Sequence, residues 1–427
     1  MAHEIKQLRW AHLPEVEAVP SGWVAAPFSG VARVIAGQSP PSETYNEAGD
    51  GLPFLQGNAD FSDKYPVPSI WCSSPVRTAK AGETLISVRA PVGEVNRADR
   101  DYAIGRGLAA IRAQIDPDFI YQAMQRWRWS LQRVAQGTTF DAVTARHFAQ
   151  LTVAVPPPGE QAAIARILDA VDTAIERTRE AIARALDLDH SLLHDLLECG
   201  LPQNRSPVGK RRTNWPVKRV DEVAEVGSGV TLGKDVSGFK AIDLPYLRVA
   251  NVQDGHLDLS NVKSVRVRLD EVDRYCLEAG DVLMTEGGDL DKLGRGAIWD
   301  GQIPDCLHQN HIFRIRANRD ILEPRFFAYI VESDIAKRYF MRVAKRTTNL
   351  ASTNKTQVRA FRFPVPPLSE QYRIAGVVAA AKAHILALRE KERALLALKR
   401  SLMHDLLTGR VRVNAKTATK QLELNLR

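Results

Sequence analysis

A glycine-rich stretch over residues 227–235, GSGVTLGKD, contains the residue types of a loop that cradles phosphate groups. Such a loop requires four residues between its first glycine and Gly-Lys, and Ser or Thr directly after the lysine. Gly229 leaves only three residues before Gly-Lys, and Asp235 follows Lys234. The spacing therefore argues against nucleotide binding, and no cofactor site is expected in this chain.

Histidine supplies the next candidates for chemistry. His308 and His311 could ligate a metal ion, but no further ligand stands near them in the sequence. A pair of histidines at strand ends is the favoured interpretation. His194 and His404 each precede an aspartate and close a leucine-rich helical pattern with no nucleophile beside them. We interpret both as packing and helix-end electrostatics.

Basic and hydroxyl side chains in two segments of the sequence could instead contact a polyanion, and they are the candidate contacts if that polyanion is DNA. Arg can bond guanine bidentately, whereas Lys and hydroxyl groups more often hold phosphate. In the first segment the candidate DNA contacts are Arg77, Arg89, Arg97, Arg106, Thr138 and Thr139. In the second they are Lys234, Lys292, Arg295, Lys345, Arg346, Thr347, Thr348, Asn354 and Lys355. A solvated surface position is the alternative for each of them.

Composition narrows the class of protein. A chain of 427 residues should hold more than one domain. The net charge of +8 and the pI near 9.3 favour a polyanionic partner, with an ordinary basic protein as the alternative. The sequence has no apolar run of about 18 residues, so no membrane span is expected. The charged first residues do not resemble a secretory signal. The four cysteines form no CxxC pair, which disfavours a zinc site and favours a cytoplasmic location.

Two long helical patterns, which must position these side chains, repeat each other. Residues 155–197 begin VPPPGEQ and residues 365–409 begin VPPLSEQ, and both reach His-Asp-Leu-Leu. In each stretch, 34 positions separate the glutamate of Glu-Gln from that histidine. Gly159 and Ser369 stand near the expected N-caps, and the acidic Glu-Gln pair falls in the first turn. The equal spacing predicts two helices of equal length.

Both helices carry apolar residues at alternating intervals of three and four, which is typical of a coiled-coil seam. The predicted seam residues are Leu168, Val171, Ile175, Ile182, Leu192, Leu196, Val378, Ala381, Ile385, Leu388, Leu395, Leu402 and Leu406. Residues 160–198 carry a net charge of −5 and residues 370–410 a net charge of +4. Opposite charges favour pairing of the two helices within one chain, with solvated charged faces as the alternative.

The repeat extends into the globular segments, where LPFLQGNA at residue 52 matches LPYLRVAN at residue 244. Short apolar runs predict strands at residues 84–90, 151–158, 246–252, 281–285, 311–317 and 361–367. Helices are expected over residues 118–135 and 324–343. The predicted fold class is α+β, with two similar globular domains separated by two long antiparallel coiled-coil helices in a pseudo-two-fold repeat. Expected boundaries are an N-terminal segment 1–19, globular domains 20–158 and 214–367, helices 159–198 and 368–410, a linker 199–213 and a tail 411–427.

Four stretches of the sequence resemble the specificity subunits of type I restriction–modification systems. They are AGETLISVRAPVGEV, IGRGLAAIRA, GTTFDAVTARHFAQLTVAVPPPGEQ and FPVPPLSEQYRIAGVV, and the resemblance spans about residues 20–413. It implies that each globular part is a target recognition domain reading one half of a split double-stranded DNA sequence. The helices would act as the spacer between the half-sites.

The resemblance also implies partners. Two modification subunits, which carry S-adenosylmethionine and methylate adenine N6, would bind this chain, and restriction subunits using ATP and Mg could join them. The chain itself would then be no enzyme, and it has no Asn/Asp-Pro-Pro-aromatic tetrapeptide of the kind found in adenine methyltransferases. The alternative is a coiled-coil scaffold whose globular domains bind protein.

Overall fold

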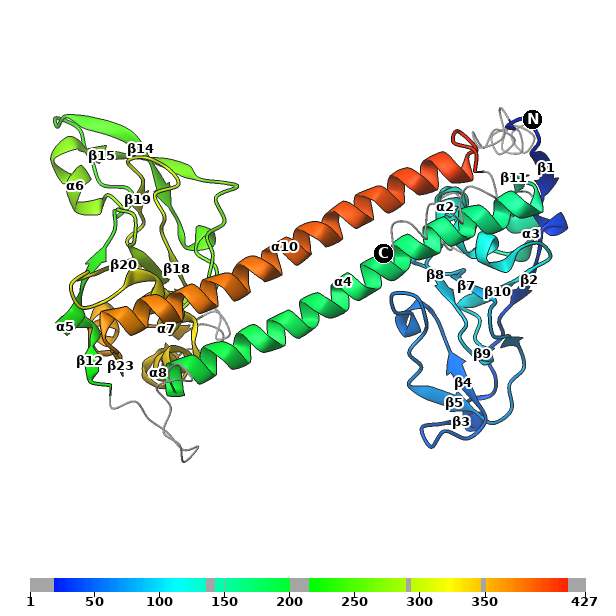
Figure 1. Ribbon diagram of the computed structural model, residues 1–427, viewed down its shortest axis with the longest axis horizontal. Helices are drawn as coiled ribbons and strands as arrows, with labels where there is room; N and C mark the ends of the chain where they lie inside the picture. Colours follow the sequence, from blue (N-terminus) through cyan, green and yellow to red (C-terminus); the bar gives the residue numbers. More distant parts are fainter. Residues whose placement is uncertain are drawn as a thin grey trace. The chain divides into compact units, whose positions relative to one another are not determined.

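The computed structural model describes residues 19–135, 143–149, 151–199, 215–288, 293–346 and 351–413. The chain forms two compact units, one made of Met1–Arg179 with Glu390–Arg427 and the other of Glu180–Arg389. Each unit holds one globular head together with part of two long helices, α4 (Pro158–Cys199) and α10 (Leu368–Leu407) (Figure 1). We call residues 19–157 head 1, which belongs to unit 1, and residues 215–367 head 2, which belongs to unit 2.

Head 1 is built on two larger sheets and one strand pair. The antiparallel four-stranded sheet has the order β2-β10-β7-β8 (Ala32–Ala36, Leu108–Ala113, Thr84–Ser87, Val95–Arg97). The five-stranded sheet has the order β3-β5-β4-β9-β6 (Tyr45–Asn46, Ile70–Cys72, Leu52–Leu55, Tyr102–Ile104, Thr78–Ala79). Strands β1 (Val24–Pro27) and β11 (Thr152–Val155) pair separately. The helices of this head are α2 (Pro117–Ala135) and α3 (Ala145–Ala149).

Strand β10 explains how head 1 builds two cores from one sheet. Successive side chains of a strand point to opposite faces. Ala109 and Ile111 therefore join the core under α2, whereas Leu108 and Ala110 join the core shared with Tyr102 of the second sheet. Both faces of the strand are covered, which is why its apolar run is continuous rather than alternating.

Head 2 repeats this plan. Its four-stranded sheet has the order β13-β20-β16-β18 (Ala224–Ser228, Ile312–Ala317, Val282–Thr285, Gly296–Ile298). A second sheet has the order β15-β14-β19 (Lys263–Arg268, Ala241–Leu247, Leu307–His308), and β14 and β19 run parallel as β4 and β9 do in head 1. A small third sheet has the order β17-β22-β21 (Gly287–Gly288, Ala351–Ser352, Lys345–Arg346). The pair β12–β23 (Val217–Arg219, Arg362–Pro364) corresponds to β1–β11.

The helices of head 2 are α5 (Val220–Val223), α6 (Val272–Tyr275), α7 (Pro324–Glu332), α8 (Asp334–Val343) and α9 (Lys355–Ala360). The structure confirms the predicted α+β class and internal repeat. The single helix predicted over residues 324–343 is wrong, because it is two helices interrupted at Ser333. The backbone of Ser333 is extended (φ −74°, ψ 163°), and its hydroxyl donates to the carbonyl of Ile330 over 2.7 Å. Local hydrogen bonding by a serine side chain thus ends α7.

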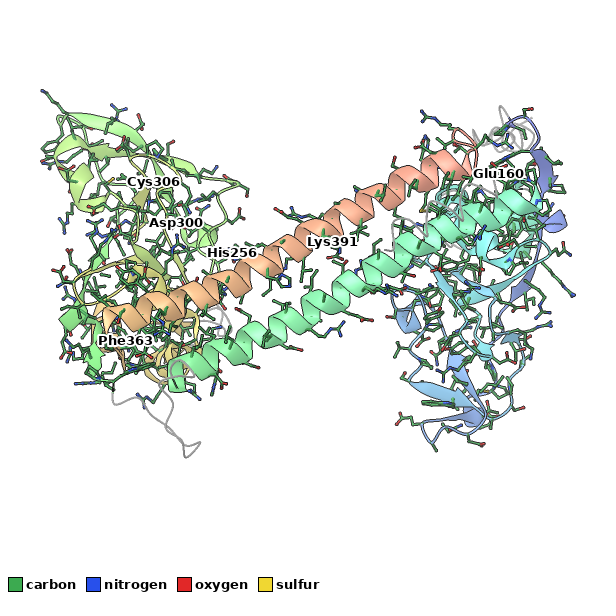
Figure 2. The ribbon with its side chains drawn as sticks, in the orientation of Figure 1. Glu160, His256, Asp300, Cys306, Phe363 and Lys391 are labelled. Carbon is green, nitrogen blue, oxygen red and sulfur yellow. The ribbon has the colours of Figure 1, made fainter. Side chains whose placement is uncertain are left out.

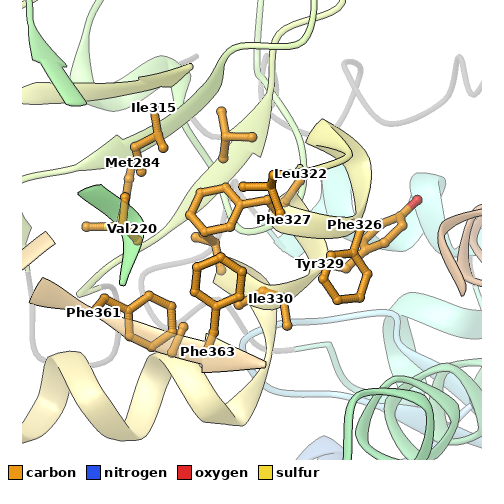
Figure 3. Close-up of a cluster of buried hydrophobic side chains, with 14 of the residues drawn as sticks. Val220, Met284, Ile315, Leu322, Phe326, Phe327, Tyr329, Ile330, Phe361 and Phe363 are labelled. Atoms are coloured by element: carbon orange, nitrogen blue, oxygen red, sulfur yellow. The ribbon is translucent and has the colours of Figure 1, made fainter. Parts of the chain in front are cut away.

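A large core lies in head 2, where Phe326 and Phe327 of α7 meet Phe361 and Phe363 at the strand β23 (Figure 3). Phe340 of α8 belongs to the same core. The ring centroids of Phe327 and Phe363 lie 5.1 Å apart, and those of Phe340 and Phe361 lie 5.3 Å apart. Both long helices contribute to this core, α4 through Leu196 and α10 through Ile374, Ala375 and Val378. Head 2 therefore cannot complete its core without the long helices.

The long helices begin one residue earlier than their predicted caps. The carbonyl of Pro157 accepts from the backbone N–H of Glu160, and the carbonyl of Pro367 accepts from the N–H of Glu370, each over 2.9 Å. Gly159 and Ser369 therefore lie inside the first turn. They stand two positions after the N-caps, which are Pro157 and Pro367, because a proline carbonyl accepts the first helical hydrogen bond in both helices. In α4, Pro158 suits the first helical position.

The Glu-Gln pair after those prolines attaches each helix to its head, and we call this arrangement the joint. In head 2, Trp215 Nε1 donates to Glu370 over 3.3 Å, and Gln371 Nε2 donates to the Pro366 carbonyl over 2.7 Å. In head 1, Trp23 Nε1 donates to Glu160 over 3.1 Å, and Gln161 Nε2 donates to the Pro156 carbonyl over 2.8 Å. Figure 2 labels Glu160 at the start of α4. The repeated motif is therefore a structural device that fixes a helix to a head.

In unit 1 the two long helices lie side by side and antiparallel (Figure 1). Lys399 Nζ lies 2.6 Å from Asp172 Oδ1, and Arg179 Nε lies 2.7 Å from Glu392 Oε1. The later residue of α4 in these two pairs contacts the earlier residue of α10, so the two helices run in opposite directions. In unit 2, Lys382 Nζ lies 3.5 Å from Asp189 Oδ2, and Leu196 near the end of α4 shares a core with Val378 near the start of α10. The direction is again antiparallel, and ion pairs of both polarities join α4 to α10.

The predicted seam residues are shielded from solvent to different degrees. Leu168, Ile175, Leu196, Val378, Ile385 and Leu406 are buried. Val171, Ile182, Leu192, Ala381, Leu388, Leu395 and Leu402 are half-buried. Leu168 and Leu406 belong to the core of head 1, and Leu196 and Val378 to that of head 2.

Candidate nucleic-acid interface

Three of the candidate arginines in head 1 are exposed. Arg77 precedes β6, Arg89 follows β7, and Arg106 lies between β9 and β10. Arg89 and Arg106 are brought close together in the fold, because the N–H of Val88 donates to the carbonyl of Gly107 over 2.9 Å. Their guanidinium groups are therefore available on one edge of the head.

Arg97, the fourth candidate arginine, is tied to head 1 itself. Its guanidinium forms an ion pair with Asp118 and lies 5.8 Å from the centroid of the Tyr121 ring. Only 20% of its side chain is exposed. These contacts join β8 to α2, so the position of Arg97 is explained by packing. Thr138 and Thr139 lie outside the described residues.

The candidates in head 2 divide into several places. Lys345 is exposed on β21, and Arg346 follows it in the same strand. Lys234 lies 3.6 Å from Glu271, in a different part of the head, and Arg295 donates to Gln253 over 2.9 Å. Lys292, Thr347 and Thr348 lie outside the described residues. Among the described candidates, Lys234, Arg295 and the pair Lys345–Arg346 thus lie in different parts of head 2.

Two other candidates have structural roles in the helix α9. Asn354 is its N-cap, and its Oδ1 accepts from the N–H of Gln357 over 2.9 Å. Lys355 is half-buried, and burial together with the nearby Arg359 lowers the pKa of its ammonium group. A cap of this kind contributes about 1 kcal/mol to helix stability. Asn354 therefore has a reason to be present apart from DNA.

The two histidines of HQNH lie at strand ends but have different environments. His308 ends β19 and is fully buried, with Nδ1 3.0 Å from the carbonyl of Tyr275. Burial lowers the pKa of His308 to about 4, so its ring is neutral near pH 7. His311 precedes β20, is exposed, and places Nδ1 2.5 Å from Glu286 Oε2. Within the described ranges, no cluster of His, Cys, Asp or Glu could hold a metal ion.

An open cavity of about 580 Å³ lies beside the pair Glu286–His311. Its other lining residues are Val249, Gly287, Gly288, Lys345, Ala351 and Ser352. The cavity combines one cation, one carboxylate and one imidazole with a small-residue wall. Sequence reasoning singled out Lys345 but missed Glu286, because its partner His311 lies 25 positions away on another strand.

The end of the described chain also contacts head 1. Arg412 donates to both carboxylate oxygens of Glu160, over 2.9 and 2.8 Å, and the N–H of Val413 donates to the same carboxylate over 3.2 Å. Burial raises the pKa of Glu160, but the bonds from Arg412, Val413 and Trp23 outweigh it and hold that pKa below its ordinary value. The residues after α10 thus bind the joint of head 1.

In the part of the chain that the structure describes, no helix is long and apolar enough to cross a membrane.

Comparison with known proteins gives a consistent result. The model of the family described as the type I restriction modification DNA specificity domain matches the chain twice, over residues 20–184 and 212–396. The StySPI type I restriction enzyme specificity subunit of Salmonella potsdam is 22% identical over 386 residues, which cover 83% of this chain and 81% of that protein. The EcoKI specificity subunit of Escherichia coli K12 is 22% identical, with the same shares covered.

A more similar but shorter match is to the MjaX specificity subunit of Methanocaldococcus jannaschii. It is 37% identical over 171 residues, which span 39% of this chain and 40% of that protein. Among solved structures, the S subunit of a type I restriction–modification system from M. genitalium is 15% identical, with a TM-score of 0.59 over 91% of this chain and 97% of that one. A chain from a structure of the type I system in assembly is 18% identical, with a TM-score of 0.55 over 92% of this chain and 100% of that one. These structures share the fold.

Proposed function

The chain belongs to the family of type I restriction–modification DNA specificity subunits, and from this premise we propose that head 1 and head 2 each read one half of a split double-stranded DNA sequence. As a specificity subunit, the chain recognises DNA and leaves catalysis to other subunits. The split-site proposal rests on one observation. Head 1 and head 2 share the same backbone scaffold but present different side chains on it. Head 1 presents Arg89 and Arg106 beside β7 and β10, whereas head 2 presents Glu286 and His311 beside β16 and β20.

Symmetry explains why two unlike heads suit a split and asymmetric site. Homodimeric DNA readers use their two-fold axis to read palindromes. Two heads joined in one polypeptide can diverge in sequence, and each can then read its own bases. The net charge of +8 supports binding to a polyanion.

The two long helices supply a fixed length. Helix α4 has 42 residues and α10 has 40, which at about 1.5 Å per residue gives roughly 60 Å for each. We propose that this length sets the number of base pairs between the two half-sites. Inserting about two helical turns into both helices, roughly seven residues each, should change the spacer and leave both half-sites intact. An unchanged spacer would refute the role of the helices as a ruler.

The family resemblance extends the proposal to partners. Two modification subunits carrying S-adenosylmethionine would bind this chain and methylate adenine N6, and restriction subunits using ATP and Mg could join them, all in the cytoplasm where the DNA lies. Apolar side chains on α10 support contact with a partner, since Leu386 is 60% exposed and Leu398 is 46% exposed. Their burial against another subunit would be favourable.

Reconstitution with the cognate modification subunit tests the proposed function. Footprinting on DNA should show two protected half-sites with an unread spacer, and sequencing of methylated DNA should return the same split motif. Affinity should fall steeply with salt, because counterions are released from DNA. Protection of one continuous site, or salt-independent binding, would contradict the proposal and favour a scaffold that binds protein.

A further inference from the structure

One backbone hydrogen bond occurs at the same place in both heads. In head 1 the N–H of Val88, just after β7, donates to the carbonyl of Gly107, just before β10, over 2.9 Å. In head 2 the N–H of Glu286, just after β16, donates to the carbonyl of His311, just before β20, over 2.9 Å. Because β7 pairs with β10 as β16 pairs with β20, these residues occupy equivalent positions.

A second hydrogen bond confirms the equivalence. The carbonyl of Val88 accepts from the N–H of Val143 over 2.9 Å, and the carbonyl of Glu286 accepts from the N–H of Thr353 over 2.7 Å. Each of these segments therefore crosses the edge of its four-stranded sheet in the same way. The backbone frame is held constant between the heads.

The side chains on this frame are entirely different. Head 2 carries a carboxylate and an imidazole, bonded to each other over 2.5 Å and exposed by 34% and 55%. Head 1 carries Val88 and Gly107 there, and the neighbouring residues Arg89 and Arg106 are exposed. One backbone frame that carries different side chains at the same place is what two readers of different bases would show. The change from a carboxylate acceptor in head 2 to two flanking guanidinium donors in head 1 reverses the hydrogen-bonding polarity.

The cavity beside the pair has small residues in its wall. Gly287 and Gly288 form part of its wall, and a Cβ atom at Gly287 would lie 2.8 Å from the carbonyl oxygen of Ala351. The space of about 580 Å³ is therefore bounded partly by backbone. Lys345 lines the same cavity and carries the positive charge that a phosphate requires.

The remaining hydrogen-bonding capacity of the pair is that of an acceptor. A carboxylate only accepts, so Nδ1–H of His311 donates to Glu286 Oε2 and holds that carboxylate in place. Glu286 Oε1 is a second acceptor. In the major groove the hydrogen-bond donors are the exocyclic amino groups of adenine N6 and cytosine N4.

We propose that Glu286, held in place by His311, reads the exocyclic amino group of one adenine or cytosine in the half-site of head 2, with Lys345 on a neighbouring phosphate. This inference rests on the proposed function, since it requires head 2 to read DNA. It makes Glu286 a specificity-determining residue and His311 its positioning residue, and it assigns head 1 a different hydrogen-bonding polarity at the same place.

The test uses the complete complex with its modification subunit and the split site found by methylation sequencing. Duplexes in which a single adenine of the second half-site is replaced by purine, or a single cytosine by 2-pyrimidinone, lack one amino group each. At one position the wild-type complex should lose roughly 5- to 150-fold in affinity, the value of one good base contact. The replaced base at that position tells adenine from cytosine.

Two variants complete a cycle with these duplexes. Glu286→Leu removes the acceptor at similar size, because leucine cannot accept a hydrogen bond, and the double variant Glu286→Val with His311→Gly installs the residues of head 1. Both should bind the modified and unmodified duplexes almost equally at that position and keep their selectivity for the first half-site. Asp243→Asn, an exposed carboxylate of the same head paired with Arg266 over 2.9 Å, should retain the full loss.

Three outcomes are distinguishable. If no split site exists for the wild-type complex, the proposed function fails. If the site exists and every amino-group removal affects Glu286→Leu as it affects wild type, the inference is overturned while the function stands. If the double variant does not assemble, selectivity for the first half-site disappears with it, and Glu286→Leu alone decides the question.

Discussion

Gln371 gives the sharpest test of how a head is attached to its helix. The side chain is fully buried, and it makes three hydrogen bonds across the joint of head 2. Its Oε1 accepts from the N–H of Glu323 over 2.8 Å, and its Nε2 donates to the carbonyls of Ile321 and Pro366 over 2.9 and 2.7 Å. Gln371→Leu keeps the volume and removes all three bonds.

The expected loss follows from the partners left behind. One backbone N–H and two carbonyls would remain buried without a partner, and each such group costs about 1–3 kcal/mol. We expect the free energy of unfolding of unit 2 to fall by about 3 kcal/mol. Gln161→Leu in head 1 should cost less, because Gln161 makes only the bond to Pro156 and a longer bond, 3.2 Å, from the N–H of Asp116.

Hydrogen exchange during urea unfolding measures this loss peptide by peptide. The amide of Glu323 should lose its protection in Gln371→Leu, and peptides of unit 2 should unfold at lower urea concentrations. Gln302→Leu is the matched control, because exposed Gln302 also accepts from a backbone N–H, that of Asp300 over 3.0 Å, and water can replace it. A change below about 1 kcal/mol with Glu323 still protected would refute the reasoning.

Three further predictions concern charged groups. Burial lowers the pKa of His308 from 6.5 to about 4, so below pH 6.5 the unfolded chain binds a proton that the folded protein does not. The stability present above pH 6.5 should therefore be lost toward pH 4, by about 2 kcal/mol at pH 5. His308→Ile introduces the residue found at the equivalent position of head 1, Ile104, and should abolish this loss in pH-dependent urea unfolding. Lys399→Met should destabilise unit 1 by about 3–5 kcal/mol, because it leaves the buried carboxylate of Asp172 without its ion-pair partner. Adding Asp172→Leu to this variant should restore most of the lost stability. Equal destabilisation in the double variant would contradict this. Arg412→Ala should weaken the joint of head 1 and leave that of head 2 unchanged, so hydrogen exchange should rise around Trp23 and Glu160 and stay constant around Trp215.

Local sequence patterns determined much of the fold. The repeat, the long helices and most strands could be predicted, because apolar periodicity reports which face of an element is buried. The predicted strand at residues 246–252 nevertheless ends at Leu247, since Val249–Asn251 form a 3₁₀ turn capped by the side chain of Asn251, whose Oδ1 accepts from the N–H of Arg248. Such side-chain bonding to the backbone competes with strand pairing and leaves no periodic signal.

Only the tertiary structure decided which polar side chains hold the protein together and which face solvent. Arg97 and Asn354 looked like Arg89 and Lys345 in the sequence, yet the first two are engaged in an ion pair and a helix cap. The pairs Glu160–Arg412 and Glu286–His311 join residues 252 and 25 positions apart. A charge or hydrogen-bonding group acts through its neighbours in space, and those neighbours are fixed by strand pairing and helix packing rather than by the residues beside it in the chain.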